Sequence, residues 1–310
     1  MTNVFSTKRR ALGVIALLLA IFNLGQSSEI HPLHGYSWDY SSLLSPERYA
    51  GAKFDDLPGF TRSMYRRNYA LITPESQVFG GNPLWKDGAA TAHLISPAVG
   101  ANFAMFLAKM GPNSTALAPA PGIERLVFIM DGVVTVTIPP AAVKKGSPKL
   151  PPLLTLHADQ FAYFPPGLQH TLTSESGAGV LVYERRYAIP NGNPTFQYGS
   201  TSDQPVLPVD GEIFVLRKLL PQTTDFDFNI HVMDFLPGEA LNVKEVHYNQ
   251  HGLLLLAGKG VYRLGDEWFP ITRGDAIWMA PYVPQWYAAL GPEPSRYILY
   301  KDTTLDPLEG

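Results

Sequence analysis

The chain contains no cysteine. This absence excludes disulfide bonds, thiolate metal ligands and cysteine nucleophiles, but it neither requires nor opposes an oxidising compartment. Charge is also sparse and balanced, because only 16% of the residues are Asp, Glu, Lys or Arg and the net charge is −3. Such a balance gives no reason to expect a nucleic acid or another polyanion as a partner.

Long apolar runs are missing as well, except at the N terminus. There, Lys8-Arg-Arg10 precedes the apolar run Ala11–Leu24, and Gly25–Ser28 follows it. A bilayer crossing needs about 20 apolar residues, and this run is shorter. We therefore expect residues 1–28 to be a secretory signal peptide, with an uncleaved membrane anchor as the alternative.

A glycosylation sequon also supports entry into the secretory pathway. Asn113-Ser-Thr115 lies in a segment rich in proline and alanine, although such triplets are also frequent by chance. Together with the expected signal peptide, it leads us to expect a protein of the secretory pathway, in the lumen of the endoplasmic reticulum, with no stable membrane insertion of the mature chain.

Helical periodicity is absent after residue 28. Instead, 28 prolines and 27 glycines punctuate short runs rich in β-branched and aromatic residues, such as Leu126–Met130, Val133–Ile138 and Gly179–Tyr183. This pattern is typical of an all-β barrel or sandwich. With 310 residues and 45% hydrophobic residues, the chain is large enough for two such cores.

The two halves of the chain repeat one another. Asp159–Pro165 resembles Asp275–Pro281, and the turn glycine Gly132 corresponds to Gly258. Val180-Leu-Val-Tyr-Glu184 likewise resembles Ile298-Leu-Tyr-Lys301. We therefore expect two tandem jelly-roll-like barrels, residues 29–190 with an extended N-terminal segment and residues 191–310. An exchange of strands between the halves is compatible with this division.

The second half carries a candidate metal site. Glu245 and His247 are two residues apart, so on a β-strand they point to the same face. His251 keeps that parity if the strand continues, or rejoins it after a turn formed by Asn249 and Gln250. Gln285 begins a second expected ligand strand. This nitrogen and oxygen donor set suits Mn, Fe, Ni or Zn.

The first half has lost these residues. Arg125 stands where the second half has His251, and prolines stand where it has Glu245 and His247. His170 is the one remnant of the second motif. We therefore expect one metal ion per chain, in the C-terminal barrel, and a structural role for the N-terminal barrel.

The frame around these ligands resembles the cupins. Gly238 precedes the run, Gly258 follows it, and Gly274-Asp275 leads towards Pro281. The usual order of ligands is permuted: Glu245 stands where the first histidine of a cupin belongs, His251 replaces the glutamate, and Gln285 replaces the last histidine.

This permuted set, together with Phe228–His231 and Tyr297–Asp302, resembles the (S)-ureidoglycine aminohydrolases, bicupins of purine breakdown in plants and bacteria. The resemblance runs from about Leu57 to Asp302. It implies a manganese-dependent hydrolase that releases ammonia from (S)-ureidoglycine, a small molecule, and yields (S)-ureidoglycolate. It also implies a homo-oligomer.

The candidate substrate residues follow from the same comparison. Tyr297, Leu299 and Lys301 share one face of an expected strand. If this face looks into the barrel, burial and a nearby cation lower the pKa of Lys301 and make it a proton relay. The alternative is an exposed lysine at a strand end. The resemblance implies that Tyr297 and Lys301 contact the substrate.

We also expect the ligands Glu245 and Gln285, together with Tyr262, to line the substrate site, although a tyrosine in a barrel wall more often serves packing. Two other readings remain open: a metal-dependent cupin dioxygenase, whose sites have a similar donor set, and a non-enzymatic storage or binding bicupin. The residues do not distinguish an imine route from direct displacement in C–N cleavage.

Overall fold

The computed structural model describes residues 31–44, 61–142, 150–208 and 211–303. The expected signal peptide, residues 1–28, lies outside the described residues. Residues 35–310 form one compact unit, to which the account below is confined. Within its described part there are strands and short 3₁₀ turns but no α-helix, and no helix is long and apolar enough to cross a membrane. The 3₁₀ turns are η1 (Ser41–Leu44), η3 (Pro74–Ser76), η4 (Pro97–Val99) and η5 (Pro140–Ala142).

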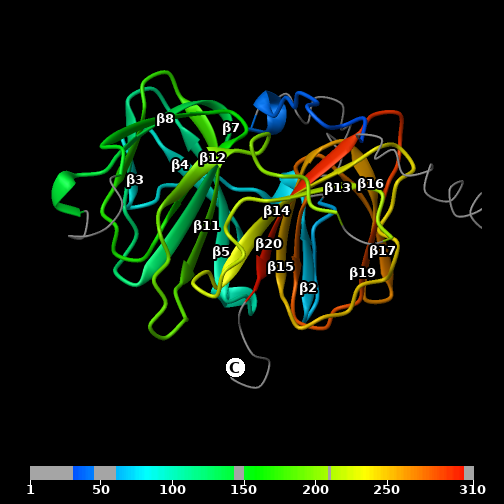
Figure 1. Ribbon diagram of the computed structural model, residues 1–310. Coiled ribbons are helices and arrows are strands. Elements are labelled where there is room, and N and C mark those ends of the chain that lie inside the picture. Colours follow the sequence, from blue (N-terminus) through cyan, green and yellow to red (C-terminus); the bar gives the residue numbers. More distant parts are fainter. Residues whose placement is uncertain (1–30, 45–60, 143–149, 209–210, 304–310) are drawn as a thin grey trace, which may run out of the picture. The chain divides into compact units, whose positions relative to one another are not determined.

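Ten strands form the sheet of the N-terminal barrel, green and cyan in Figure 1. The long strand β7 lies at its centre and pairs with β8, β9, β10 and β11 along its length. The ten strands are β3 (Trp85–Lys86), β4 (Ala90–Ile95), β5 (Phe103–Met110), β6 (Ser114–Leu117), β7 (Ile123–Thr137), β8 (Leu153–His157), β9 (Gln160–Phe164), β10 (Thr171–Ser174), β11 (Ala178–Arg186) and β12 (Gln197–Ser200).

The C-terminal barrel has a seven-stranded sheet in the order β1-β2-β18-β15-β20-β14-β13 and a three-stranded sheet in the order β17-β16-β19. Their strands are β1 (Met64–Tyr65), β2 (Tyr69–Ile72), β13 (Val215–Lys218), β14 (Phe228–Phe235), β15 (His251–Ala257), β16 (Lys259–Leu264), β17 (Glu267–Thr272), β18 (Ala276–Met279), β19 (Gln285–Ala289) and β20 (Ser295–Asp302). The prediction of an all-β chain with two barrels is confirmed.

Strands are exchanged between the halves. β2, from the first half, pairs with β18 of the C-terminal barrel, and β12, which follows the expected linker, pairs with β9 of the N-terminal barrel. The division near residue 190 stays a prediction about domains, but the sheets cross it in both directions.

Equivalent glycine turns support the internal repeat. Gly132 and Gly258 both have positive φ, 74° and 75°. A Cβ on Gly132 would lie 2.3 Å from the carbonyl oxygen of Gly177, and one on Gly258 would lie 2.5 Å from that of Pro294. Both positions therefore require glycine for the same two reasons, left-handed backbone and close approach of the neighbouring chain.

The apolar core has three parts, one inside each barrel and one between them. The shared part contains Phe103 and Phe128 of the first barrel and Ile298 and Tyr300 of the second. Alternate residues of β20 therefore face different cores: Ile298 and Tyr300 face the other barrel, whereas Tyr297 and Leu299 face the interior of their own. This parity directs the odd-numbered residues of β20 towards the candidate site.

The two barrels are in close contact beside β15, the strand that begins with His251. The rings of Phe103 and Tyr300 stack with centroids 3.9 Å apart. A Cβ on Gly252, next to His251, would lie 2.5 Å from the ring of Phe103. Glycine at this position therefore allows the ring of the N-terminal barrel to pack directly on the strand that carries His251.

A buried polar network crosses the same interface. Arg185 of β11 donates to Asp302 Oδ1 over 2.7 Å, and the Tyr300 hydroxyl donates to the same oxygen over 2.6 Å. Asn102 donates to the other oxygen of Asp302 over 3.2 Å. Because Arg185 and Asp302 are almost fully removed from water, removing the arginine leaves an uncompensated charge on the aspartate.

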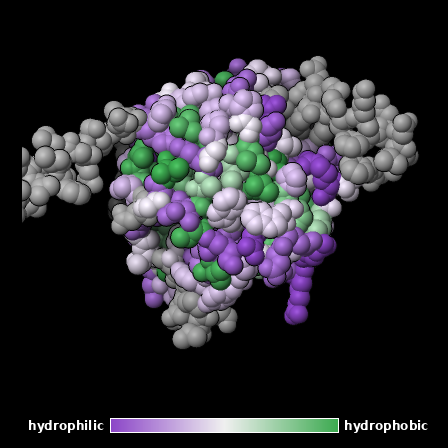
Figure 2. Space-filling model, turned by 90° about the vertical axis from the view of Figure 1, so that its right-hand side faces the viewer, coloured by the Kyte–Doolittle hydropathy of each residue, from purple (hydrophilic) through white to green (hydrophobic). Residues whose placement is uncertain are grey.

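On the outer face of the C-terminal barrel, apolar side chains lie among hydrophilic ones (Figure 2). Large side chains exposed by half or more include Val243, Val246, Trp268 and Tyr282. Val246 lies between the ligands Glu245 and His247, so part of this apolar surface borders the candidate site.

Glu124 of β7 has an unusual place in the interface. Its Oε2 accepts a 2.5 Å hydrogen bond from Tyr163, whereas its Oε1, like Oδ1 of Asp227, is buried without a donor among the described residues. Burial, and then the interaction with Asp227, raise the pKa of Glu124 to about 10. A proton on Glu124 can be donated to Asp227 and satisfies both oxygens.

This arrangement predicts a loss of stability with rising pH. The folded chain keeps the Glu124 proton up to about pH 10, whereas the unfolded chain loses it above about pH 4.5. The free energy of unfolding therefore decreases through that window, by at most about 1.4 kcal/mol per pH unit. Glu124→Gln carries a permanent donor for Asp227, so we expect a flatter pH dependence and a more stable protein at pH 8.

The measurement is urea unfolding between pH 5 and pH 9. Glu175→Gln, at an exposed position, is the control and should follow the wild-type curve. Parallel curves for Glu124→Gln and the wild type would show that Glu124 is ionised in the folded protein.

Candidate metal centre

Glu245 and Gln285 are held together by their backbones. They form an isolated antiparallel bridge, in which the Glu245 amide donates to the Gln285 carbonyl over 2.9 Å and the Gln285 amide donates back over 3.0 Å. Gln285 begins β19, but Glu245 lies outside any regular strand. The continuous ligand strand that the spacing allowed is therefore absent, and a bridge to β19 fixes Glu245 instead.

His247 and His251 are placed by different means. The His247 carbonyl accepts a 2.8 Å hydrogen bond from the amide of Tyr282, whose φ is 63°. His251 is the first residue of β15, opposite Met279 on one side and Lys301 on the other. The chain thus rejoins the barrel wall after a turn, the second of the two arrangements that the sequence permits.

The turn between His247 and His251 is buried and makes contacts of its own. Asn249 and Gln250 are both buried, and Asn249 donates to the backbone oxygen of Asp302. The side-chain oxygen of Gln250 accepts a 3.2 Å hydrogen bond from the amide of Asn102 in the N-terminal barrel. The sequence predicted a turn here but not the hydrogen bond to Gln250 that connects the ligand segment to the other barrel.

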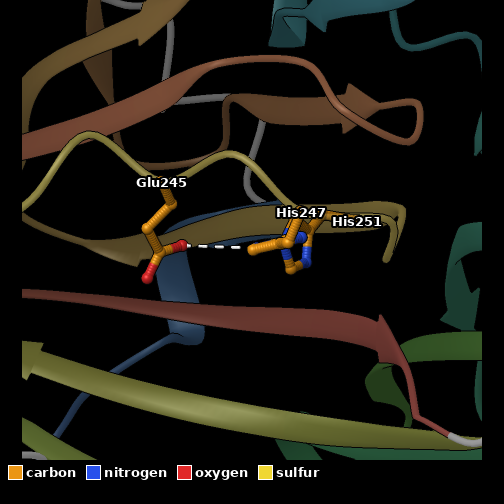
Figure 3. A group of neighbouring side chains, drawn as sticks. All are labelled: Glu245, His247 and His251. Atoms are coloured by element: carbon orange, nitrogen blue, oxygen red, sulfur yellow. Dashed lines mark hydrogen bonds and ion pairs between the residues drawn. The ribbon is translucent and has the colours of Figure 1, made fainter.

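The donor atoms converge at one point. Within the described residues, Glu245, His247 and His251 are the only group of three or more His, Asp or Glu side chains close enough to hold a metal ion, with one donor atom from each within 4.8 Å of the others. The Nε2 atoms of the two histidines are 3.1 Å apart, and Nε2 of His247 is 3.5 Å from Oε2 of Glu245. Figure 3 shows these side chains directed towards one another.

These separations fit a common metal ion. Nitrogen and oxygen donors bind zinc at about 2.0–2.2 Å, so neighbouring donors lie about 3 to 3.5 Å apart. Glu245 and His247 are partly exposed, with 33% and 23% of their side chains accessible. A ligand from solution can therefore reach the same point.

Gln285 completes the donor set if its amide is turned. Its Nε2 is 3.2 Å from both Glu245 Oε2 and His247 Nε2, while its Oε1 accepts a 2.8 Å hydrogen bond from the hydroxyl of Tyr262. An amide binds a cation through oxygen, so a ligand role requires the reverse orientation. The Tyr262 hydroxyl is compatible with both orientations because it can either donate or accept a hydrogen bond.

The charges at the site favour metal binding. Burial, together with the charge of Lys301, holds the pKa of His251 well below its usual range, so its ring is neutral and has a lone pair for a ligand. Burial acts to raise the pKa of Glu245, but hydrogen bonding to His247 and the charge of Lys301 outweigh it and lower that pKa. Glu245 is therefore a carboxylate at neutral pH.

Lys301 faces the site from β20. It is the Cα partner of His251 across β15 and β20, so the two side chains lie on the same face of the sheet. Burial lowers the pKa of Lys301, the charge of Glu245 opposes this, and Lys218 adds to it. The structure places this lysine inside the barrel and not at an exposed strand end.

The two candidate tyrosines lie deeper in the same interior. Tyr262 and Tyr297 are 1% and 2% exposed and belong to the core of the C-terminal barrel. Burial raises the pKa of both hydroxyls well above the usual value, so both are neutral. The structure thus brings the four candidate ligands and Tyr262 together and places Tyr297 and Lys301 on the adjoining wall.

Sequence reasoning gave no role to His231, which the structure places on this wall too. It lies on β14, beside β20, and only 8% of its surface is exposed. Its position two residues from Asn229 and Met233 on one face is readable from the sequence, but the pairing of β14 with β20 is not.

The N-terminal barrel holds a different arrangement at the equivalent place. Arg125 pairs across β7 and β11 with Glu184, as His251 pairs with Lys301. The guanidinium is fully buried, lies 2.6 Å from a Glu184 oxygen and donates to the carbonyl of Leu117 over 2.7 Å. The remnant His170 is 3.3 Å from the same guanidinium, and burial followed by the Arg125 charge lowers its pKa to about 3.

The fold is that of a cupin of two barrels, and the donor set of its C-terminal barrel is one that could hold a metal ion. Residues 231–300 match the family described as the Cupin domain. The crystal structure of the protein Ylba from E. coli superposes with a TM-score of 0.68 at 26% identity, covering 83% of this chain and 99% of that one.

More similar relatives narrow the class. The (S)-ureidoglycine aminohydrolase of Arabidopsis thaliana is 54% identical over 254 residues, which cover 82% of each chain. The probable (S)-ureidoglycine aminohydrolase of Oryza sativa is 52% identical over 260 residues, covering 84% of this chain and 81% of the rice protein. The chain belongs to the (S)-ureidoglycine aminohydrolase family and is an enzyme.

The site predicts one metal ion per chain. His247→Ala removes a partly exposed donor, so we expect it to reduce bound metal to less than about one tenth of an ion per chain with little loss of stability. His170→Ala, the matched change in the N-terminal barrel, should leave the metal content unchanged. Elemental analysis and thermal unfolding of the purified variants test both statements. Two ions per wild-type chain, or loss of metal in His170→Ala, would contradict the assignment.

Proposed function

We propose that the chain is a manganese-dependent hydrolase that converts (S)-ureidoglycine and water into (S)-ureidoglycolate and ammonia. The observation that carries this proposal is the convergence of Glu245, His247, His251 and Gln285 beside Lys301, in a chain of the (S)-ureidoglycine aminohydrolase family. The reaction replaces one C–N bond by a C–O bond, with no change of oxidation state.

The four donors would hold the ion, with His247 and His251 as neutral nitrogen ligands and Glu245 as the one anion. This set accepts manganese, although the usual order of affinity favours later metals of the series. A divalent ion bound here would act as a template and Lewis acid for a substrate that offers a carboxylate and an amine on one carbon.

Lys301 is the group that moves protons in this proposal. Because burial lowers its pKa, an uncharged Nζ is more available near neutral pH than on an ordinary lysine. It accepts a proton from water as the C–O bond forms and returns it to the departing ammonia. Tyr297 and Tyr262, with Glu245 and Gln285, bind and orient the substrate.

Ammonia release from freshly generated ureidoglycine tests the reaction. We expect manganese-loaded protein to form ammonia and ureidoglycolate at the same rate with and without oxygen. A requirement for oxygen would point to a cupin dioxygenase, and stable metal without turnover would point to a binding protein.

The lysine predicts a specific kinetic pattern. Lys301→Met should keep the metal and lower kcat by about 10²–10⁴-fold, the usual contribution of a positioned acid or base. Lys301→Arg should restore little, because a guanidinium stays charged near neutral pH. Steady-state kinetics and metal analysis of both variants give the measurement.

Lys259→Met, at an exposed position of β16, is the matched control and should behave as wild type. Recovery by Lys301→Arg, mainly through KM, would make Lys301 a charge that binds the substrate. Wild-type rates in both Lys301 variants would remove this strand from the mechanism.

We also propose that the protein acts in the lumen of the endoplasmic reticulum as a homo-oligomer. The basic and apolar segment before Gly25 and the sequon at Asn113 support this location. Asn113 is exposed, in a turn with φ of 60°, where a glycan can be attached. An intact Met1 on protein from native tissue would argue against a cleaved signal peptide.

A further inference from the structure

His231 faces the interior of the C-terminal barrel between two candidate substrate residues. On the paired strands β14 and β20, Asn229 lies opposite Lys301, His231 opposite Leu299 and Met233 opposite Tyr297. His231 is therefore diagonal to both Lys301 and Tyr297 on one face of the sheet, about 7–8 Å from each, a spacing at which the three side chains can contact the same small molecule.

The side chain carries an unpartnered polar atom. His231 is 92% buried, since 8% of its surface is exposed, and its Nε2 has no hydrogen-bond partner among the described residues. A buried polar atom of this kind destabilises the folded protein unless a partner satisfies it. The neighbours of His231 on this face, Leu299 and Met233, are apolar and cannot donate a hydrogen bond to Nε2.

The surroundings also fix the charge of the ring. Burial, followed by the positive charges of Lys301 and Lys218, holds the pKa of His231 well below its usual range. The ring is neutral, so one of its two nitrogens has a lone pair that can accept a hydrogen bond, and the unpartnered Nε2 is available for this role. A neutral acceptor suits an uncharged N–H donor and not a carboxylate.

We propose that His231 is a specificity-determining residue whose Nε2 accepts a hydrogen bond from the terminal NH₂ of the ureido group. This inference rests on the proposed function, in which the carboxylate and amine of the substrate lie at Glu245, His247 and His251. The ureido group is the uncharged end of the same molecule and extends along the wall formed by β20 and β14. Lys301 is on β20, between the strand of His251 and the strand of His231, and in this placement it lies beside the carbon at which the C–N bond breaks.

A pair of stable ligands isolates this contact. N-carbamoylglycine and N-acetylglycine both carry the carboxylate and differ at the far end, where the first has NH₂ and the second has CH₃. We expect manganese-loaded wild-type protein to bind N-carbamoylglycine about three- to tenfold more tightly, the worth of one net hydrogen bond. Isothermal titration calorimetry gives both dissociation constants.

Variants of His231 test whether this residue causes the preference for N-carbamoylglycine over N-acetylglycine. His231→Phe keeps the ring but has no acceptor, so the preference should disappear while the affinity for N-acetylglycine stays the same. His231→Gln places an amide oxygen near the position of Nε2 and should restore part of it. Met233→Leu, the next residue on the same face of β14, should keep the wild-type ratio.

Equal affinities for the two ligands in wild-type protein overturn the inference, as does a preference that survives in His231→Phe. Failure of the proposed function is a separate result: wild-type protein would then release no ammonia from ureidoglycine. Normal ammonia release with an unchanged ligand ratio in His231→Phe rejects the role of His231 alone.

Discussion

The ion pair between Arg185 and Asp302 is the contact on which the geometry of the site depends. Asp302 is the last residue of β20, directly after Lys301, and its backbone oxygen accepts a hydrogen bond from Asn249 in the ligand segment. Arg185 belongs to the other barrel. One buried ion pair thus fixes both the end of the strand that carries the lysine and the segment that carries the histidines. Among the described residues, the N-terminal barrel contributes to the site by position, and all the candidate metal ligands belong to the C-terminal barrel.

The two barrels also show two ways to place positive charge at one point of the same fold. In the N-terminal barrel the charge is the guanidinium of Arg125, which is covalently attached and neutralised by Glu184. In the C-terminal barrel the equivalent positions hold His251 and Lys301, and a metal ion bound by His251 would place a second positive charge beside this lysine. Replacing Arg125 by histidine alone would leave Glu184 and the Leu117 carbonyl without their partner, so this single change would not reproduce the arrangement of the C-terminal barrel.

Local pattern was sufficient for the parts of this structure that depend on parity and turns. The alternation along Tyr297, Leu299 and Lys301 placed all three on one face, and the repeated glycines gave the two barrels. Pattern was insufficient wherever distant strands set the geometry. The place of His231 depends on the register between β14 and β20, and Glu245 is fixed by a bridge to Gln285. Such registers are set by pairing between strands that are distant in the sequence, which no local spacing encodes.

During synthesis, the exchanged strand β2 emerges long before the strand with which it pairs in the C-terminal barrel. Its partner β18 follows roughly 200 residues later, a delay of about 10–40 s at usual rates of translation. Until then, the buried strand Tyr69–Ile72 has an apolar face and an unpaired edge, which is a template for aggregation. The barrel that carries the metal ligands therefore closes only when nearly the whole chain has emerged from the ribosome, and a nascent chain that stalls before β18 is a natural client for chaperones.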